Sequence, residues 1–225
     1  MPAAVPRRLR RSDLPLDAVK LARFLIGKTV VHDLPQGRVS GRIVETEAYP
    51  PGDPAGHAFT GWTRSRSSLF LRRGHAYVYV SYGAWNMLNV SAGPDGVGAG
   101  VLIRALEPLE GIASMVRRRG TAKLKDLARG PGRLAVALAI SMDLDGVDLC
   151  GRGPLWLGTA TRQPVIVDTS TRIGLSRAAD RRLRFVERGS AFVSGPKRLL
   201  TAAGGRRGRA AGPARRLLAG KGERI

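Results

Sequence analysis

The sequence contains a single cysteine, Cys150, among its 225 residues. An internal disulfide therefore cannot form, and a chain without disulfides is typical of a reducing compartment such as the cytoplasm. The chain also lacks a run of about 18 apolar residues, so no segment is expected to cross a membrane as a helix. Residues 1–11 are basic but lack the apolar core of a signal peptide. We therefore expect a cytoplasmic protein, nucleoid-associated if it is bacterial, with no membrane partner.

Residues for several common chemistries are also scarce. The chain has only three histidines, and neither these nor Cys150 show the spacing of metal ligands. It has no Gly-rich loop ending in Gly-Lys-Ser/Thr and no serine nucleophile elbow. A zinc site, a nucleotide-hydrolysing loop and a serine hydrolase are therefore not expected.

Acidic residues are few, since 17 Asp and Glu stand against 38 Lys and Arg and give a net charge of +21. The isoelectric point is about 11.6. Such a charge attracts polyanions, either nucleic acid or an anionic membrane surface. For a chain with no membrane segment, nucleic acid is the expected partner.

The basic residues are concentrated toward the ends of the chain. In residues 201–225, Gly, Ala and Pro separate the basic residues, which predicts a disordered tail that serves solubility or grips phosphates without reading sequence. Residues 1–12 are a basic N-terminal arm. Between them we find no repeat and no clear linker, so residues 13–200 are expected to form one domain with a sizeable core.

The domain sequence alternates many short strand-like segments with a few helical ones. Helices are expected over 16–25, with Asp13 as N-cap and Gly27 at the end, from Pro108 to about Arg118, and over 134–140. Strands are expected over 28–32, 41–49, 75–83, 86–91 and 101–107, and near 155–157, 165–167 and 183–193. Because strands outnumber helices and many connections are short, the predicted fold is α+β, with a mostly antiparallel sheet flanked by helices.

The strand over 41–49 carries two carboxylates. Alternation places Ile43, Glu45 and Glu47 on one face of this strand. Both carboxylates could simply face solvent, because burying them unpaired is costly. Glu47, however, lies at the end of the strand before a long polar loop over 50–68, where a scaffold tends to present functional residues.

Arg104 lies inside another apolar strand. A buried arginine needs an anionic partner, and Glu47 is the obvious candidate. The spacing leaves open whether such a pair is structural or catalytic.

Two further features point to nucleic acid. Tyr82 stands at a tight turn before Gly83, where its ring could enter a base stack or pack over its own hairpin. Residues 130–133, Gly-Pro-Gly-Arg, precede a predicted helix and could hold a phosphate on free backbone N–H groups or form an ordinary turn.

Several sequence blocks, in the same order, resemble the alkyladenine (3-methyladenine) DNA glycosylase family. The blocks are RIVETEAY (42–49), AGH (55–57), YVYVSYG (77–83), NMLNV (86–90), VLIRALEP (101–108), GPGRL (130–134), RIG (172–174) and LRF (183–185). The resemblance covers roughly residues 16–194, which is a far more specific signal than any single short motif.

The resemblance implies a base-excision-repair enzyme that binds double-stranded DNA, flips a damaged purine out of the duplex and hydrolyses its N-glycosidic bond. It also implies a curved sheet and a protruding β-hairpin that inserts into DNA. Glu47 would be the general base that activates water, and Arg104 and the backbone carbonyl of Ile173 would help to hold that water. The other implied site residues are Tyr49, His57, Tyr79 and Asn89 in the base pocket, Tyr82, Ala84 and Trp85 for intercalation, and Arg133 for phosphate.

The implied substrates are 3-methyladenine, 7-methylguanine, hypoxanthine and ethenoadenine. The matched active-site blocks contain no lysine, so we expect a monofunctional, monomeric glycosylase that leaves an abasic site and needs no metal or cofactor. The chain departs from the family pattern in having Arg64-Ser65-Arg66 where an Arg-Asn pair is usual, and in the bulk of Trp85. Two alternatives remain: a non-catalytic basic nucleic-acid-binding module on the same scaffold, and a bifunctional lyase, which would need an amine nucleophile.

Overall fold

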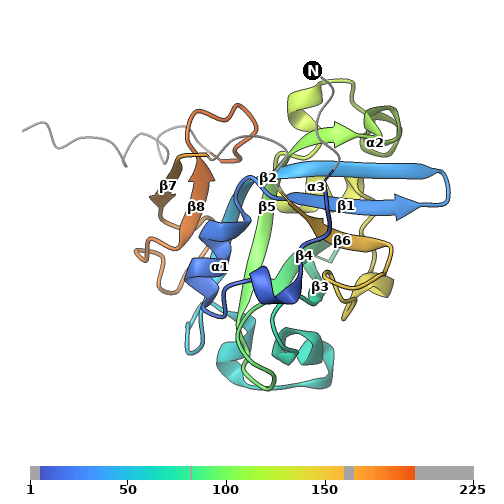
Figure 1. Ribbon diagram of the computed structural model, residues 1–225. Helices are drawn as coiled ribbons and strands as arrows, with labels where there is room; N and C mark the ends of the chain where they lie inside the picture. Colours follow the sequence, from blue (N-terminus) through green and yellow to red (C-terminus); the bar gives the residue numbers. More distant parts are fainter. Residues whose placement is uncertain (1–5, 82, 160–164, 196–225) are drawn as a thin grey trace, which may run out of the picture.

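Antiparallel strands form a curled sheet at the centre of the molecule (Figure 1). The structure, a computed structural model, describes residues 6–81, 83–159 and 165–195. The strands are β1 (Thr29–Leu34), β2 (Gly37–Tyr49), β3 (Ala76–Ser81), β4 (Trp85–Ser91), β5 (Gly100–Glu110), β6 (Leu155–Gly158), β7 (Val167–Ser170) and β8 (Arg184–Glu187). Their order is β3-β4-β5-β2-β1-β6, while β8 pairs with both β2 and β7. The predicted single α+β domain with an antiparallel sheet is confirmed.

Short helices cover the sheet. They are α1 (Ala18–Leu25), α2 (Ile112–Arg119) and α3 (Pro131–Ala137), with 3-10 helices η1 (Arg11–Asp13), η2 (His57–Thr60), η3 (Arg64–Phe70), η4 (Leu124–Asp126) and η5 (Met142–Leu144). Helix α1 packs on β2, where the Thr46 hydroxyl donates to the Ala22 carbonyl at 2.9 Å. Within the described residues, no helix has the length and apolar character needed to span a membrane.

Helix α1 starts later than predicted, and Asp13 is not its N-cap. The cap is Asp17, whose Oδ1 accepts a hydrogen bond from the Lys20 N–H at 2.8 Å. The reason is Pro15, because a residue that precedes proline is disfavoured in the helical region, and Leu14 is extended (φ −81°, ψ 127°). Gly27 follows the helix with φ +83°, the left-handed conformation in which glycine commonly ends a helix, as predicted.

The second helix also starts later than predicted. Strand β5 runs on to Glu110, and α2 begins at Ile112 after Gly111, whose φ is +69°. Pro108 is accommodated within the strand because it lies opposite Gly41 at a register shift, where a missing backbone N–H is tolerated. Helix α3 likewise starts at Pro131 rather than near 134, with proline in its first turn.

A β-bulge in β2 changes the predicted alternation. The register with β5 passes from Ile43 opposite Leu106 to Glu45 opposite Ala105, so Val44 is the extra residue. Ile43 therefore packs in the main core, whereas Val44 packs in a second cluster with Ala105. The prediction that Ile43 shares a face with the two carboxylates is wrong.

Strand β2 is paired on both edges where it carries these carboxylates. Strand β5 pairs along one edge, and on the other edge β1 pairs with residues 37–42 and β8 with residues 45–47. The side chains of Glu45 and Glu47 are consequently fully buried.

The segment between β2 and β3, predicted as a polar loop, contains the two 3-10 helices η2 and η3, drawn blue-green at the bottom of Figure 1. It is tied to the sheet through Asp145, whose Oδ1 accepts from the Ser68 hydroxyl at 2.6 Å and from the Val78 N–H at 2.8 Å. These contacts hold the segment beside β3.

The two ends of the chain are described only in part. Residues 1–5 and the predicted basic tail, 201–225, lie outside the described residues. Residues 6–12 lie against the domain, because Leu9 is buried in the core and Arg8 donates to the Gly151 carbonyl at 2.6 Å.

Candidate active site

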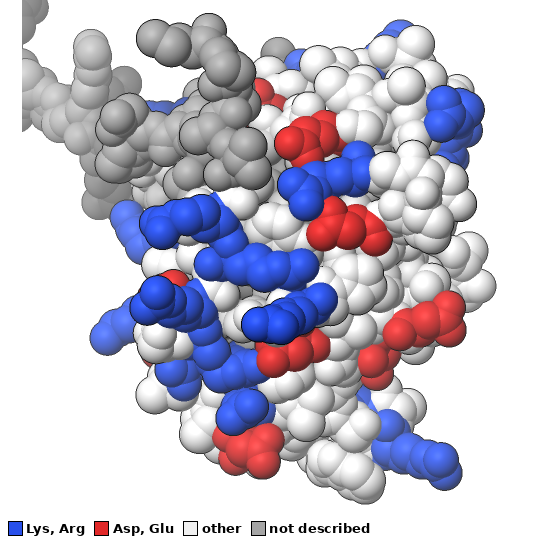
Figure 2. Space-filling model, turned by 45° about the vertical axis from the view of Figure 1, so that its right-hand side comes forward, with Lys and Arg blue, Asp and Glu red and all other residues white. Residues whose placement is uncertain are grey.

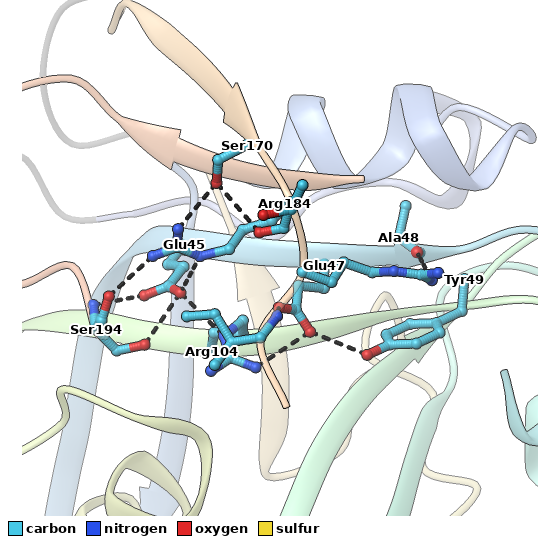
Figure 3. A network of polar contacts seen from close by, with 11 residues as sticks. Glu45, Glu47, Ala48, Tyr49, Arg104, Ser170, Arg184 and Ser194 are labelled. Carbon is cyan, nitrogen blue, oxygen red and sulfur yellow. Dashed lines mark hydrogen bonds and ion pairs between the residues drawn. The ribbon is translucent and has the colours of Figure 1, made fainter. Parts of the chain in front are cut away.

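Four charged side chains are buried together between β2, β5 and β8 (Figure 3). They are Glu45 and Glu47 from β2, Arg104 from β5 and Arg184 from β8. Arg104 is 8% exposed and the other three are fully buried. The formal charges of the four groups sum to zero, which is how such a cluster can be buried at an acceptable energy.

The carboxylate of Glu47 accepts hydrogen bonds on both oxygens. Its Oε1 accepts from the Ile173 N–H at 2.8 Å. Its Oε2 accepts from the Tyr49 hydroxyl at 2.9 Å and from Arg104 Nη1 at 3.1 Å. A carboxylate can accept about four hydrogen bonds, so Glu47 has capacity for another donor on Oε1.

Glu45 is held more tightly than Glu47. Its Oε1 accepts from Arg184 Nε at 2.7 Å and from Arg104 Nε at 2.9 Å. The Ser194 hydroxyl also donates to Oε1, at 3.0 Å, and the Ser194 backbone N–H donates to Oε2, at 2.6 Å. The predicted anionic partner of Arg104 is therefore present, but Arg104 bridges two carboxylates rather than pairing with Glu47 alone.

The two titratable neighbours of Glu47 keep their protons. Burial alone would lower the pKa of Arg104, but the charges of Glu47 and Glu45 outweigh it and raise that pKa above the usual value. Burial, followed by the charge of Glu47, raises the pKa of the Tyr49 phenol. Near neutral pH, Glu47 therefore faces a cation and a neutral phenol donor.

A cavity of about 110 Å³ lies beside this cluster. It is lined by Tyr49, Ala55, His57, Leu69, Tyr77, Tyr79, Asn89, Gly100 and Leu175. The rings are packed together: His57 lies 4.3 Å from Tyr79 between ring centroids, and Tyr79 stacks on Tyr77 at 5.4 Å. All four predicted pocket residues thus meet in one small aromatic cavity. Glu47 is not in the cavity wall but behind Tyr49, whose hydroxyl connects the two.

His57 is a neutral member of the wall. Burial, aided by the charge of Arg66, lowers the pKa of its imidazole below the usual value. Its Nδ1 lies 2.8 Å from the Tyr77 hydroxyl, and burial raises the pKa of that phenol. An uncharged ring of this kind can stack on a base without repelling a cationic one.

Tyr49 is also supported from outside the cavity. The guanidinium of Arg172 lies 4.7 Å from the centre of its ring. Arg172 is in turn paired with Asp53 through contacts of 2.6 and 3.1 Å, and both side chains are fully buried.

Of the predicted DNA-contacting residues, Ala84, Trp85 and Arg133 are not among those that line the aromatic cavity. Tyr82 is outside the described residues, while Ala84 and Trp85 are exposed next to it in the β3–β4 hairpin. Trp85 packs against Gly132 and shares with Arg133 a second cavity of about 490 Å³. The insertion of this hairpin into DNA remains a prediction.

Basic side chains gather in a band on the face shown in Figure 2, with acidic side chains between and beside them.

In the part of the chain that the structure describes, no group of three or more His, Cys, Asp and Glu is placed to hold a metal ion.

Sequence reasoning did not predict the roles of four residues in this region. Glu45 and Arg184 belong to the buried charge cluster, and Arg172 and Asp53 form the ion pair behind Tyr49. Arg184 carried the same signal as Arg104, an arginine inside a strand-like apolar segment. No comparable signal marks Arg172 or Asp53, which lie in polar segments.

A buried carboxylate beside a small aromatic cavity, on a strongly basic chain, is the arrangement expected of an enzyme that acts on a single nucleic-acid base. Comparison with known proteins identifies the family. The model of the methylpurine-DNA glycosylase (MPG) family matches residues 12–191. The chain belongs to this family, and the predicted DNA glycosylase, a hydrolase of N-glycosyl bonds, is confirmed.

Individual relatives agree with this assignment. A protein of Mesorhizobium japonicum is 62% identical over 191 residues, which cover 85% of this chain and 92% of the relative. A protein of Paraburkholderia phytofirmans is 58% identical over 192 residues, with 85% and 90% covered. A protein of Methanoculleus marisnigri is 44% identical over 182 residues, with 79% and 94% covered. Each of the three carries the name "Putative 3-methyladenine DNA glycosylase".

Proposed function

We propose that the protein excises alkylated and deaminated purines from duplex DNA, with Glu47 as the general base that activates water. The observation that carries the proposal is the hydrogen bond between Glu47 and Tyr49, which connects a buried carboxylate to the wall of a base-sized aromatic cavity. The proposed substrates are 3-methyladenine, 7-methylguanine, hypoxanthine and ethenoadenine.

In the proposed reaction, Glu47 takes a proton from water while the water oxygen attacks the sugar C1′. The N-glycosidic bond breaks, and its electron pair leaves with the base. Arg104 and the carbonyl of Ile173 help to hold the water. General-base catalysis contributes roughly 10²- to 10⁴-fold, and the negative charge of Glu47 further stabilises the cationic sugar of the transition state.

The aromatic cavity selects the base by stacking. A positively charged alkylated purine between Tyr49 and the rings of His57 and Tyr79 gains about 0.5–2 kcal/mol from cation–π attraction. Neutral lesions lack this gain. Asn89 lines the same cavity and is fixed by hydrogen bonds from its Nδ2 to the Tyr77 and Met87 carbonyls. It is in a position to discriminate against the amino group of guanine, as the resemblance implies.

Flipping a base out of the duplex costs a few kcal/mol, and least for a damaged base. Tyr82, with Ala84 and Trp85, would offset part of this cost by filling the gap in the stack. Arg133 would contact a phosphate beside the hairpin. The described residues that line the aromatic cavity include no lysine, which supports a monofunctional reaction that leaves an abasic site.

The test is single-turnover release of free base from a panel of duplexes, each with one of the four lesions. We expect release from at least one duplex and an intact abasic site as the product. Binding without release from any duplex would instead support a non-catalytic binding module, and covalent trapping by borohydride would support a lyase.

Removal of residues 201–225 should weaken binding to all DNA, damaged or not. This segment contains seven Lys and Arg and one acidic residue. Log K falls as log salt rises, and each phosphate contact that is lost makes this negative slope less steep by about 0.9. The measurement is binding to undamaged duplex over a range of salt concentrations. An unchanged slope would show that the tail does not contact DNA.

A further inference from the structure

We propose that Glu45 is a positioning residue: it holds Arg104 so that this arginine reaches Glu47 with one nitrogen only and leaves Glu47 free to act on water. The inference rests on the proposed role of Glu47. It assigns a function in the reaction to the second buried carboxylate of β2.

The geometry of Arg104 is divided between two acceptors. Its Nε donates to Glu45 at 2.9 Å, and its Nη1 donates to Glu47 at 3.1 Å. Buried Arg172, in contrast, donates to its partner Asp53 from two nitrogens, at 2.6 and 3.1 Å. Buried Arg184 donates to Glu45 from Nε alone, because other acceptors hold its remaining nitrogens. A buried guanidinium here makes a single contact with a carboxylate where another acceptor competes for it, and for Arg104 and Glu47 that competitor is Glu45.

Glu45 is itself immobilised by groups outside the reaction. Arg184 Nε and the backbone N–H of Ser194 donate to it at 2.7 and 2.6 Å. Arg184 is fixed in turn by donation to the Ser170 hydroxyl and the Ser194 carbonyl, each at 2.9 Å. Figure 3 shows these contacts converging on Glu45 from the side away from Tyr49. Glu45 can therefore hold Arg104 in place without following it toward Glu47.

Charge balance gives Glu45 a second effect. The charged and titratable groups around Glu47 are Arg104 from β5, Arg184 from β8, and Glu45 and Tyr49 from its own strand, with Arg172 behind the Tyr49 ring. Loss of the Glu45 charge leaves an excess of positive charge around Glu47. The added positive charge favours the carboxylate form of Glu47, and a carboxylate stabilised in this way is a weaker base. Arg104 is then also free to bind both oxygens of Glu47.

The test is Glu45→Gln, which keeps the shape of the side chain and removes its charge. Single-turnover release of 7-methylguanine is measured against pH, because this cationic leaving group needs no protonation and the acid limb then reports the base alone. We expect the plateau rate to fall about tenfold or more and the acid limb to move to lower pH, because a negative charge beside the base is lost.

Glu107→Gln is the matched control. Glu107 lies on β5 and accepts from buried Arg42 of β2, so this variant also removes one carboxylate from a buried ion pair of the same two strands. It should lose stability but keep the wild-type pH profile. A wild-type profile in Glu45→Gln, or the same shift in Glu107→Gln, would overturn the inference.

A second measurement covers the case in which Glu45→Gln does not fold. In Glu47→Gln, the NMR signal of the Arg104 Nε–H should stay at its wild-type, hydrogen-bonded position, because Glu45 still holds it. Loss of that signal would show that Glu47, not Glu45, fixes the arginine.

The two proposals can fail separately. Excision that persists in Glu47→Gln would contradict the proposed function itself. If Glu47→Gln is inactive but Glu45→Gln behaves like the wild type, only the positioning role is contradicted.

Discussion

Glu47→Gln should abolish base excision while leaving affinity for lesion-containing DNA nearly unchanged. The amide keeps the shape of the side chain and can still accept from the Tyr49 hydroxyl, but it cannot take a proton from water and carries no charge to stabilise a cationic sugar. We expect the single-turnover rate to fall by about 10³-fold or more. The measurements are base release and equilibrium binding on the same lesion duplex.

Glu110→Gln is the control for this substitution. Glu110 lies at the far end of β5 from the aromatic cavity and is partly exposed, so its replacement changes the net charge equally without touching the site. Equal excision by wild type and Glu47→Gln would remove Glu47 from the mechanism. A parallel loss of binding would mean that the substitution had disturbed the pocket rather than the chemistry.

Much of the site could be predicted because its residues lie in short contiguous motifs. Glu47 and Tyr49 are two positions apart on one strand. Tyr79 and Asn89 lie on the two strands of a hairpin that the sequence shows clearly, with Asn89 opposite Tyr77. The anionic partner of Arg104 could also be expected, since burial of an unpaired guanidinium is too costly. In these cases local pattern and elementary energetics determine the arrangement.

The rest depends on contacts between distant parts of the chain. Glu45 meets Arg184 across 139 positions, and Asp53 meets Arg172 across 119. No spacing rule reports such pairs. The sequence also carries no signal for the bulge at Val44. Because of this bulge, Ile43 packs in the core while both carboxylates lie with Arg104 on another buried face. Strand continuation through Pro108 was hidden because proline is usually a sign of a strand's end.

Arg172→Met should reduce the free energy of unfolding by about 3 kcal/mol at neutral pH, because it leaves the buried carboxylate of Asp53 without its main partner. The value is at the low end for a buried pair, since half-exposed Arg181 lies 3.3 Å from the same carboxylate and can compensate in part. The loss also removes the cation behind Tyr49 and the donor to the Ala48 carbonyl. Denaturant unfolding measures the free energy of unfolding. The rate of base release at limiting enzyme concentration measures the effect on the pocket, and we expect this rate to fall.

Arg188→Met is the matched control. Arg188 pairs with Asp168 at the surface, where the Arg188 side chain is 59% exposed, and a surface pair of this kind contributes about 0–1 kcal/mol.

The pH dependence of stability provides a second check. Burial would raise the pKa of Asp53, but hydrogen bonds from Arg172 lower it below the usual value, so the pair stabilises the wild type above about pH 4 and this contribution is lost as pH falls. In Arg172→Met, protonation of Asp53 relieves the unpaired charge at acid pH. The stability difference between the two proteins should therefore narrow as pH falls, and adding Asp53→Asn to Arg172→Met should restore part of the lost stability at pH 7. A constant difference across pH, with no restoration in the double variant, would show that Arg172 acts through packing rather than through its charge.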